Sequence, residues 1–175
     1  MDGRPFANQN EMDETLIENW NAVVKKYDDV YVLGDFFHHS RRHDMADILL
    51  QLHGKIHLII GNHDEYLVKA LKNGKLPQAA SQRIDVLGEI KLLNYQKRKL
   101  ILCHYPLPTY PGRFHTRNDE NLNTYMLYGH VHTTGEYDMI RQLIAEQETP
   151  MQMINVGTMV WEYRPVNIEE ILKIQ

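Results

Sequence analysis

Cysteine is almost absent from this sequence, with Cys103 the only one among 175 residues. A lone cysteine cannot form a disulfide within the chain, and Cys103 stands inside the apolar run 100–103. A thiol in such a run is expected to be buried and unreactive, as in a protein of a reducing compartment. A disulfide-stabilised secreted fold and a sulfur-rich structural zinc site are therefore not expected.

Long apolar runs and a strong excess of one charge are also lacking. No run approaches the roughly 20 apolar residues of a membrane span, and residues 1–6 lack the apolar core of a signal peptide. The net charge of −4 gives no reason to expect nonspecific binding to nucleic acid or to an anionic membrane. We expect a cytoplasmic protein, and the length fits a single domain, residues 1–175, with a sizeable core.

Helical and strand-like patterns alternate in the first half of the chain. A helix is expected from Asn10, with Asn10 as its cap. Two further helices are predicted at 43–53 and 64–72, and two strands at 30–33 and 56–60. This order predicts parallel strands covered by helices, and so an α/β fold.

The second half is richer in strands. They are predicted at 84–94, 99–103, 125–128 and 153–156, and the first two form a hairpin around 96–98. A long loop follows His104 and contains three prolines, and a loop of this length is commonly functional. A short helix is expected within 138–149, and Asn167 with Glu170 predicts a capped C-terminal helix.

Histidine is abundant, with ten residues. Polar side chains follow four predicted strands where each ends: Asp35, Asn62 with His63, His104, and His130 with His132. Strand ends at one sheet edge lie close together, so we expect these groups to converge. Oxygen and imidazole donors without thiolates suit divalent Mn, Fe, Zn, Ni or Co.

Each of these residues also has an ordinary structural explanation. Asp35 could be a turn residue, His104 could be a buried histidine bonded to backbone, and His130 could simply end a strand. Asn62 could cap the following helix, with Glu65 completing a capping box. Four such endings in one chain favour a shared site, because the ordinary explanation would have to hold separately at each strand.

Four short segments, taken in order, resemble the motifs of the calcineurin-like metallophosphoesterase family. They are VLGD at 32–35, GNHD at 61–64, CHYP at 103–106 and GHVH at 129–132. The tail that begins with NVG at 155–157 looks like the small bacterial and phage members. The resemblance implies a four-layer αββα sandwich with a two-metal site at the strand ends.

The resemblance also implies a role for each matching residue. Asp35 would bridge both metals, with manganese the expected ion; Asn62, His104 and His130 would complete one metal site, and His132 would bind the other. Such a site would hydrolyse phosphomonoesters or phosphodiesters through a metal-bound hydroxide.

Two catalytic residues are implied as well. His63 would steady the phosphate or protonate the leaving oxygen, and Asp64 would orient His63. Asn62 and His63 are predicted contacts to the substrate phosphate. Arg113 could contact the phosphate too, because it lies on the long loop that leads back to His130, although exposed loop charges are usually only solvated.

The sequence departs from the family at its start. Family members open with a strand that carries an Asp-x-His motif and supplies two more ligands, and residues 1–10 contain no such strand. One metal would keep four protein ligands, but the other would keep only Asp35 and His132. Reduced activity is therefore expected, and the chain is either mononuclear as written or truncated at its start. The alternative is a non-catalytic scaffold that binds metal, a phosphate ligand or a protein partner.

The missing strand has a structural consequence too. It would leave unpaired backbone and an apolar slot, to be filled by rearrangement or by a partner chain, including a second copy in a homo-oligomer. Three histidines after Asp35 are candidate replacement ligands: His38, His39 and His43. Surface histidines at the start of a helix would explain them equally well.

Overall fold

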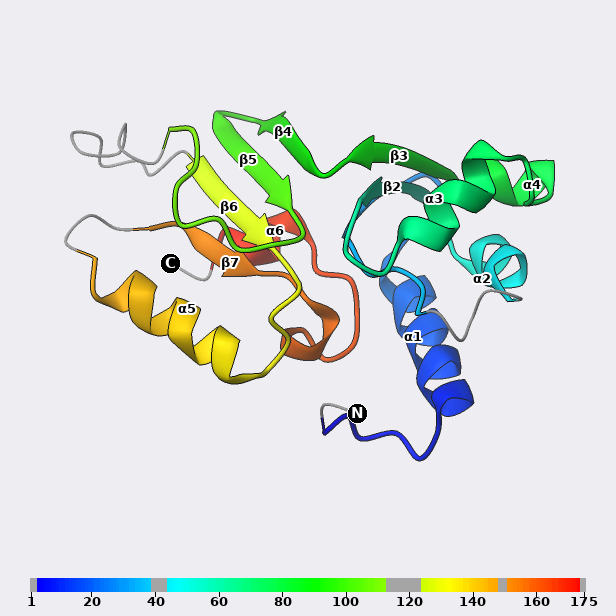
Figure 1. Ribbon diagram of the computed structural model, residues 1–175, viewed down its shortest axis with the longest axis horizontal. Coiled ribbons are helices and arrows are strands. Elements are labelled where there is room, and N and C mark those ends of the chain that lie inside the picture. Colours follow the sequence, from blue (N-terminus) through cyan, green and yellow to red (C-terminus); the bar gives the residue numbers. More distant parts are fainter. Residues whose placement is uncertain (1–2, 39–43, 113–123, 148–150, 174–175) are drawn as a thin grey trace.

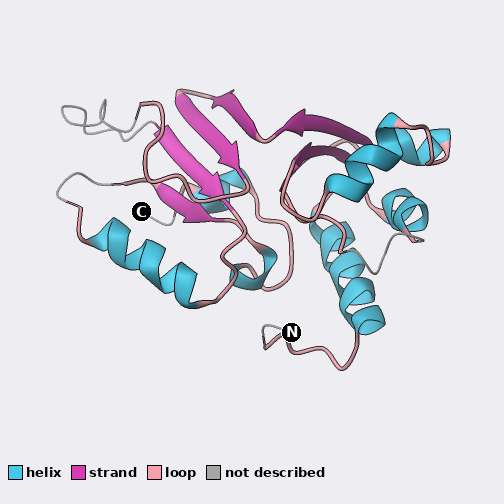
Figure 2. Ribbon diagram, viewed as in Figure 1, coloured by secondary structure: helices cyan, strands magenta, loops and turns pink. Residues whose placement is uncertain are grey.

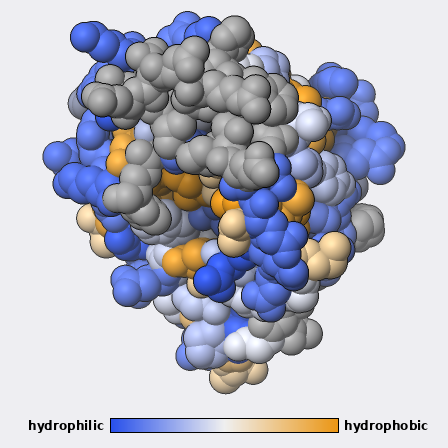
Figure 3. Space-filling view, turned by 90° about the vertical axis from the view of Figure 1, so that its left-hand side faces the viewer, coloured by the Kyte–Doolittle hydropathy of each residue, from blue (hydrophilic) through white to orange (hydrophobic). Residues whose placement is uncertain are grey.

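The computed structural model describes residues 3–38, 44–112, 124–147 and 151–173, which form two β-sheets and several helices (Figures 1 and 2). On the face shown in Figure 3, hydrophilic side chains surround smaller apolar areas. No helix in the described ranges is both long and apolar enough to cross a membrane.

The first sheet is parallel throughout. It contains β1 (Asp29–Leu33), β2 (Lys55–Ile59) and β3 (Ile84–Gly88), in that order. Four helices accompany it: α1 (Gln9–Val23), α2 (Met45–Gln51), α3 (Glu65–Lys72) and α4 (Gln78–Ser81). The alternation of strands and helices in the sequence therefore predicted β1, β2 and the helices α1, α2 and α3, but not the short α4 or the end of β3.

The second sheet is mixed. Its strand order is β4 (Ile90–Tyr95), β5 (Arg98–Cys103), β6 (Thr124–Tyr128) and β7 (Met153–Asn155). The β4–β5 pair is an antiparallel hairpin, as expected, and the other pairs are parallel. Its accompanying elements are α5 (Gly135–Ala145), the 3-10 helix η3 (Thr158–Val160) and α6 (Ile168–Ile171).

One expected strand is in fact two strands in different sheets. The run 84–94 was interpreted as continuous, but β3 ends at Gly88 and β4 begins at Ile90. Gly88 has a φ of 101°, a backbone conformation that glycine adopts without steric cost. Its carbonyl still accepts a hydrogen bond from the Ile60 backbone N–H, and the chain then leaves the first sheet. The 84–94 prediction was wrong because an apolar run does not show where the backbone turns.

One helix cap differs from expectation and another agrees with it. The first helix is capped by Asn8, not Asn10, and the Asn8 side chain accepts a hydrogen bond from the Glu11 backbone N–H. The cap at Asn167 is present and accepts from the Glu169 N–H. Glu170 pairs with Arg164 at 2.8 Å.

The buried side chains form three clusters that define four layers. One cluster joins the first sheet to α1–α4 and includes Trp20 and Leu49. Another joins the second sheet to α5 and includes Met126. The third lies between the sheets, where Ile59 meets Leu102. This order of helix, sheet, sheet and helix confirms the αββα arrangement.

Candidate metal centre

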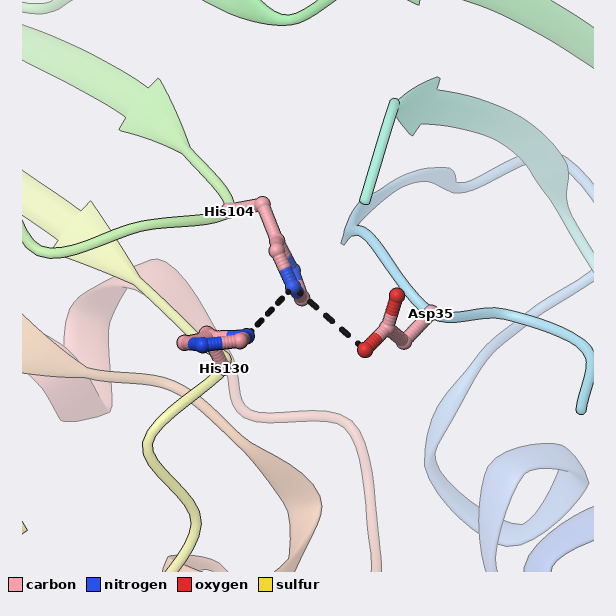
Figure 4. Close-up of side chains that lie close together, drawn as sticks. All are labelled: Asp35, His104 and His130. Carbon is pink, nitrogen blue, oxygen red and sulfur yellow. Dashed lines mark hydrogen bonds and ion pairs between the residues drawn. The ribbon is translucent and has the colours of Figure 1, made fainter. Parts of the chain in front are cut away.

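Polar residues that follow β1, β2, β5 and β6 meet between the two sheets. Figure 4 shows Asp35 approaching from the first sheet and His104 and His130 from the second. One ligand atom from each of these three residues lies within 4.8 Å of the others. Asn62 joins them from the loop after β2. The structure thus brings together the four residues that were assigned to one metal.

The ring of His104 lies at the centre of this group. Its Nε2 atom is 2.9 Å from Asn62 Oδ1, 3.0 Å from His130 Nδ1 and 3.4 Å from Asp35 Oδ2. Its Nδ1 is 2.8 Å from the Leu33 carbonyl oxygen, which can only accept a hydrogen bond. Nδ1 therefore carries a hydrogen, and in the neutral ring Nε2 carries a lone pair.

Either a proton or a metal cation would relieve the repulsion between the His104 Nε2 lone pair and the neighbouring oxygens. Two of the three atoms around His104 Nε2 are oxygens in the Asp35 carboxylate and the Asn62 amide, and the nitrogen of His130 can donate at most one hydrogen bond. A divalent cation fits this donor set, because carboxylate and amide oxygens and imidazole nitrogens all bind such ions, and the ligand atoms of Asp35, His104 and His130 lie within 4.8 Å of one another. The His104–Leu33 bond would then fix the tautomer of a ligating imidazole.

The charged groups influence one another's protonation. Burial opposes ionisation of Asp35, but the His104 ring and the His63 backbone N–H outweigh it, so the pKa of Asp35 lies below its ordinary value. Burial also opposes protonation of His104, yet the Asp35 carboxylate and the Leu33 carbonyl raise its pKa above the ordinary value. Burial and the neighbouring His104 lower the pKa of His130. A bound cation would replace the proton on His104.

Three site residues have an unusual backbone conformation. Asp35, His130 and His132 have φ values of 55°, 63° and 45°, in the left-handed region that side chains other than glycine rarely adopt. Such conformations persist only where the surrounding structure enforces them, and they cluster at functional sites. The loops after β1 and β6 are therefore shaped to present particular side chains.

Two glycines allow the loops to approach each other. A Cβ atom on Gly34 would lie 2.3 Å from His104 Nδ1, and one on Gly61 would lie 2.5 Å from the backbone nitrogen and Oδ1 of Asp35. Neither distance is sterically tolerable. In the sequence Gly61 is only the first residue of the GNHD segment, and nothing there indicates its close packing against Asp35.

Asp64 is fully buried and holds the same loops together. Its carboxylate accepts hydrogen bonds from the backbone N–H groups of Gly61, Asp35 and Phe36, each at 2.8 Å. Burial raises its pKa, although these three bonds oppose the rise. The role expected of Asp64 in orienting His63 stays a prediction, and the contacts seen are with the backbone around Asp35.

The remaining expected residues lie around this group. The His63 backbone N–H donates to Asp35 Oδ1 at 2.9 Å, and the His63 ring centroid lies 5.8 Å from that of His38. His132 lines the same cavity as Asp35 but is not one of the three histidine and carboxylate residues that meet. Three candidates lie outside the residues that the structure describes, so their predicted roles stay predictions: His39, His43 and Arg113.

The alternative cap role of Asn62 was wrong. The residue at the cap position of α3 is Asp64, and the Asn62 side chain faces His104 instead. Sequence reasoning also missed Tyr105, whose ring centroid is 4.5 Å from that of His130. Its hydroxyl donates to Asn62 Oδ1 at 3.4 Å. The one available signal was its position directly after His104.

Comparison with known proteins identifies the family and a similar fold. A family model described as the calcineurin-like phosphoesterase superfamily domain matches residues 13–169. The chain is 31% identical over 174 residues to "Uncharacterized protein MJ1445" of Methanocaldococcus jannaschii, covering 98% of this chain and 79% of that protein. A crystal structure of a protein of unknown function, AQ665 from Aquifex aeolicus, superposes with a TM-score of 0.64 at 22% identity. The superposition covers 98% of this chain and 89% of that one, and it supports the fold.

Proposed function

Because the chain belongs to the calcineurin-like phosphoesterase superfamily, we propose that it is a metal-dependent hydrolase of phosphomonoesters or phosphodiesters. The observation that carries the proposal is the convergence of Asp35, Asn62 and His130 on the lone pair of His104. These are the donors of one divalent metal site, with manganese as the expected ion. The phosphate ester itself is a small molecule that reaches the cavity between the sheets.

The protein's own groups divide into those that hold the metal and those that meet the substrate. A divalent cation bound here would lower the pKa of a water molecule and neutralise charge on the phosphate. Asp35, Asn62, His104 and His130 would hold that cation. We assign to the exposed His63 the role of proton donor to the leaving oxygen, and the support for this role is that its backbone N–H donates to Asp35 Oδ1, which keeps it beside the site.

We infer one well-held metal for each chain. The four donors are His104 and the three groups around it, which come from the loops after β1, β2 and β6, whereas a second ion would have only Asp35 and His132 in common with the family pattern. Two protein ligands hold a metal weakly in competition with water. The proposal therefore includes low turnover for this chain, and the same observation supports the alternative of a non-catalytic scaffold that binds one metal and a phosphate ligand.

Metal content and turnover, measured on the same preparation, test the proposal. We expect about one Mn²⁺ per chain by elemental analysis, together with slow hydrolysis of p-nitrophenyl phosphate or bis-p-nitrophenyl phosphate. Asp35→Asn should lose both the metal and the hydrolysis. Asp138→Asn is the matched control, because Asp138 is an exposed residue of α5 and should leave both unchanged.

The hydrolase and the non-catalytic scaffold predict different results in these two measurements. A stoichiometric metal with no hydrolysis above that of Asp35→Asn would favour the scaffold. Absence of bound metal at saturating Mn²⁺ and Zn²⁺ would contradict both functions.

A further inference from the structure

The two edges of the second sheet differ in length. One edge is β7, which has only three residues, and very short edge strands are one way in which proteins avoid pairing with another chain. The other edge is β4, which has six residues and no proline and lies at the margin of the sheet (Figure 1). Its pairing with β5 is unbroken, and no strand in the described ranges pairs with its outer side. β4 is therefore an open template for another strand.

The backbone groups on this open edge follow from the turn between β4 and β5. Tyr95 pairs with Arg98 across the two-residue turn 96–97, so these residues form the hydrogen-bonded pair beside the turn. Hydrogen-bonded and non-hydrogen-bonded pairs alternate along an antiparallel ladder. The N–H and C=O groups of Ile90, Leu92 and Asn94 therefore point away from β5.

Two apolar side chains of β4 are exposed, with 50% of Ile90 and 58% of Leu92 accessible to solvent. They pair with Cys103 and Ile101 of β5, which are buried in the cluster beneath α5. The apolar layer of the second sheet thus continues onto its edge strand, where the described residues leave it uncovered. A strand added at this edge would cover part of that surface.

The charges along β4 suit a second copy of the same strand. Glu89 precedes the strand and Lys97 follows it, and both are exposed. Two copies paired antiparallel about a two-fold axis at Leu93 place Glu89 of each copy opposite Lys97 of the other. Moving the axis one residue toward the N-terminus would leave Glu89 opposite Tyr95, and moving it one residue the other way would place Lys91 opposite Lys97. Charge therefore selects the axis at Leu93.

The same register joins the outward backbone groups. Leu92 of each copy pairs with Asn94 of the other, and both residues present their N–H and C=O groups toward the open edge. Lys91 then lies opposite Tyr95, whose hydroxyl donates to the exposed Glu169 at 2.6 Å. A second cation of one copy thus comes near a carboxylate of the other.

We propose that the outer edge of β4 is a homodimer interface, at which a second copy of this chain adds its own β4 antiparallel and extends the second sheet across a two-fold axis at Leu93. The inference does not rest on phosphoesterase activity, because neither the metal ligands nor turnover enters it. Its test measures association alone.

Sedimentation of the intact chain from about 5 to about 500 μM measures this association, and we expect a dimer whose proportion rises with concentration. Glu89→Lys and Lys97→Glu each place like charges opposite each other at both ends of the interface, so each should weaken the dimer by about tenfold. The double variant restores the attraction with the signs exchanged and should regain most of the affinity. Lys75→Glu is the matched control, because it makes the same charge change at an exposed position after α3.

Leu92→Pro tests the backbone contacts. The Leu92 N–H points away from β5, so proline removes no hydrogen bond within the sheet but does remove a donor of the interface. We expect this variant to be a monomer, and the charge variants decide the question if it fails to fold. A chain that stays monomeric at about 500 μM would overturn the proposal and leave a strand of another protein as the occupant to seek. A dimer that resists the single charge variants would overturn it too, because the copies would then meet through another surface.

Discussion

Replacing Asp64 with asparagine preserves the size of the side chain and changes what its terminal atoms can accept. The carboxylate accepts from Gly61 and Asp35 through Oδ2 and from Phe36 through Oδ1. An asparagine has one oxygen, so its amide group must face at least one of these N–H donors. Asp64→Asn therefore breaks one or more buried hydrogen bonds and places two donors opposite each other.

The expected loss of stability follows from these contacts. A hydrogen bond to a charged group contributes about 1.5–3 kcal/mol, and an unsatisfied buried donor adds a further penalty. Burial raises the pKa of Asp64, so the ionised carboxylate carries a desolvation cost that its removal partly relieves. We expect Asp64→Asn to lower the free energy of unfolding by about 2–4 kcal/mol. For a chain of this length the melting temperature should fall by roughly 4–16 °C.

The same substitution should weaken metal binding. The backbone N–H of Asp35 is held by Asp64, so loss of that bond frees the loop that presents the Asp35 carboxylate. Removal of a group that supports a metal ligand typically lowers affinity by about 10–100-fold. Calorimetric titration with Mn²⁺ measures this, alongside thermal unfolding without metal.

The control is Asp138→Asn, the same chemical change at an exposed position in the first turn of α5. There we expect less than about 1 kcal/mol. The reasoning is refuted if Asp64→Asn melts within about 1 °C of the unsubstituted chain, or if Asp138→Asn is destabilised as much.

Three further predictions concern other parts of the structure. Metal affinity should fall by about tenfold per pH unit below the raised pKa of His104, because a protonated imidazole cannot ligate. Equal affinities at about pH 8 and about pH 5.5 would contradict ligation by His104 and His130. Gly61→Ala should cost about 1–3 kcal/mol in urea unfolding, because its Cβ would strike the loop after β1, whereas Gly135→Ala meets nothing within 4 Å and should not destabilise. Arg164 lowers the pKa of Glu170, so their pairing stabilises the fold above the ordinary glutamate pKa and is lost as the pH falls through the lowered value. Glu170→Gln should therefore reduce the free energy of unfolding at neutral pH and have no effect in acid. An equal loss at both pH values would contradict the pairing.

The convergence of the site could be predicted because strand ends are visible in the sequence. Apolar runs end just before Asp35, Asn62, His104 and His130, and the carboxyl ends of neighbouring parallel strands meet at one edge of each sheet. Those two facts require no knowledge of side-chain contacts. The layered α/β arrangement followed in the same way, from the alternation of helical and strand-like periods. The sequence did not show that the four strands divide between two sheets, whose edges meet at the site.

The contacts that hold the site could not be predicted, because they join residues far apart in the sequence. Asp64 reaches the backbone of Asp35 and Phe36, and Gly34 packs against the ring of His104. Neither residue type indicates its partner. The change of sheet at Gly88 was missed for a related reason, since periodicity reports burial and not backbone direction.

A crystal structure of the chain grown with Mn²⁺, with anomalous scattering recorded at the manganese edge, tests the central claim most directly. The account predicts one strong peak coordinated by Asp35, Asn62, His104 Nε2 and His130 Nδ1, with the His104 Nδ1–Leu33 hydrogen bond retained. No peak among these four residues, or a strong peak bound elsewhere in the chain, would contradict it.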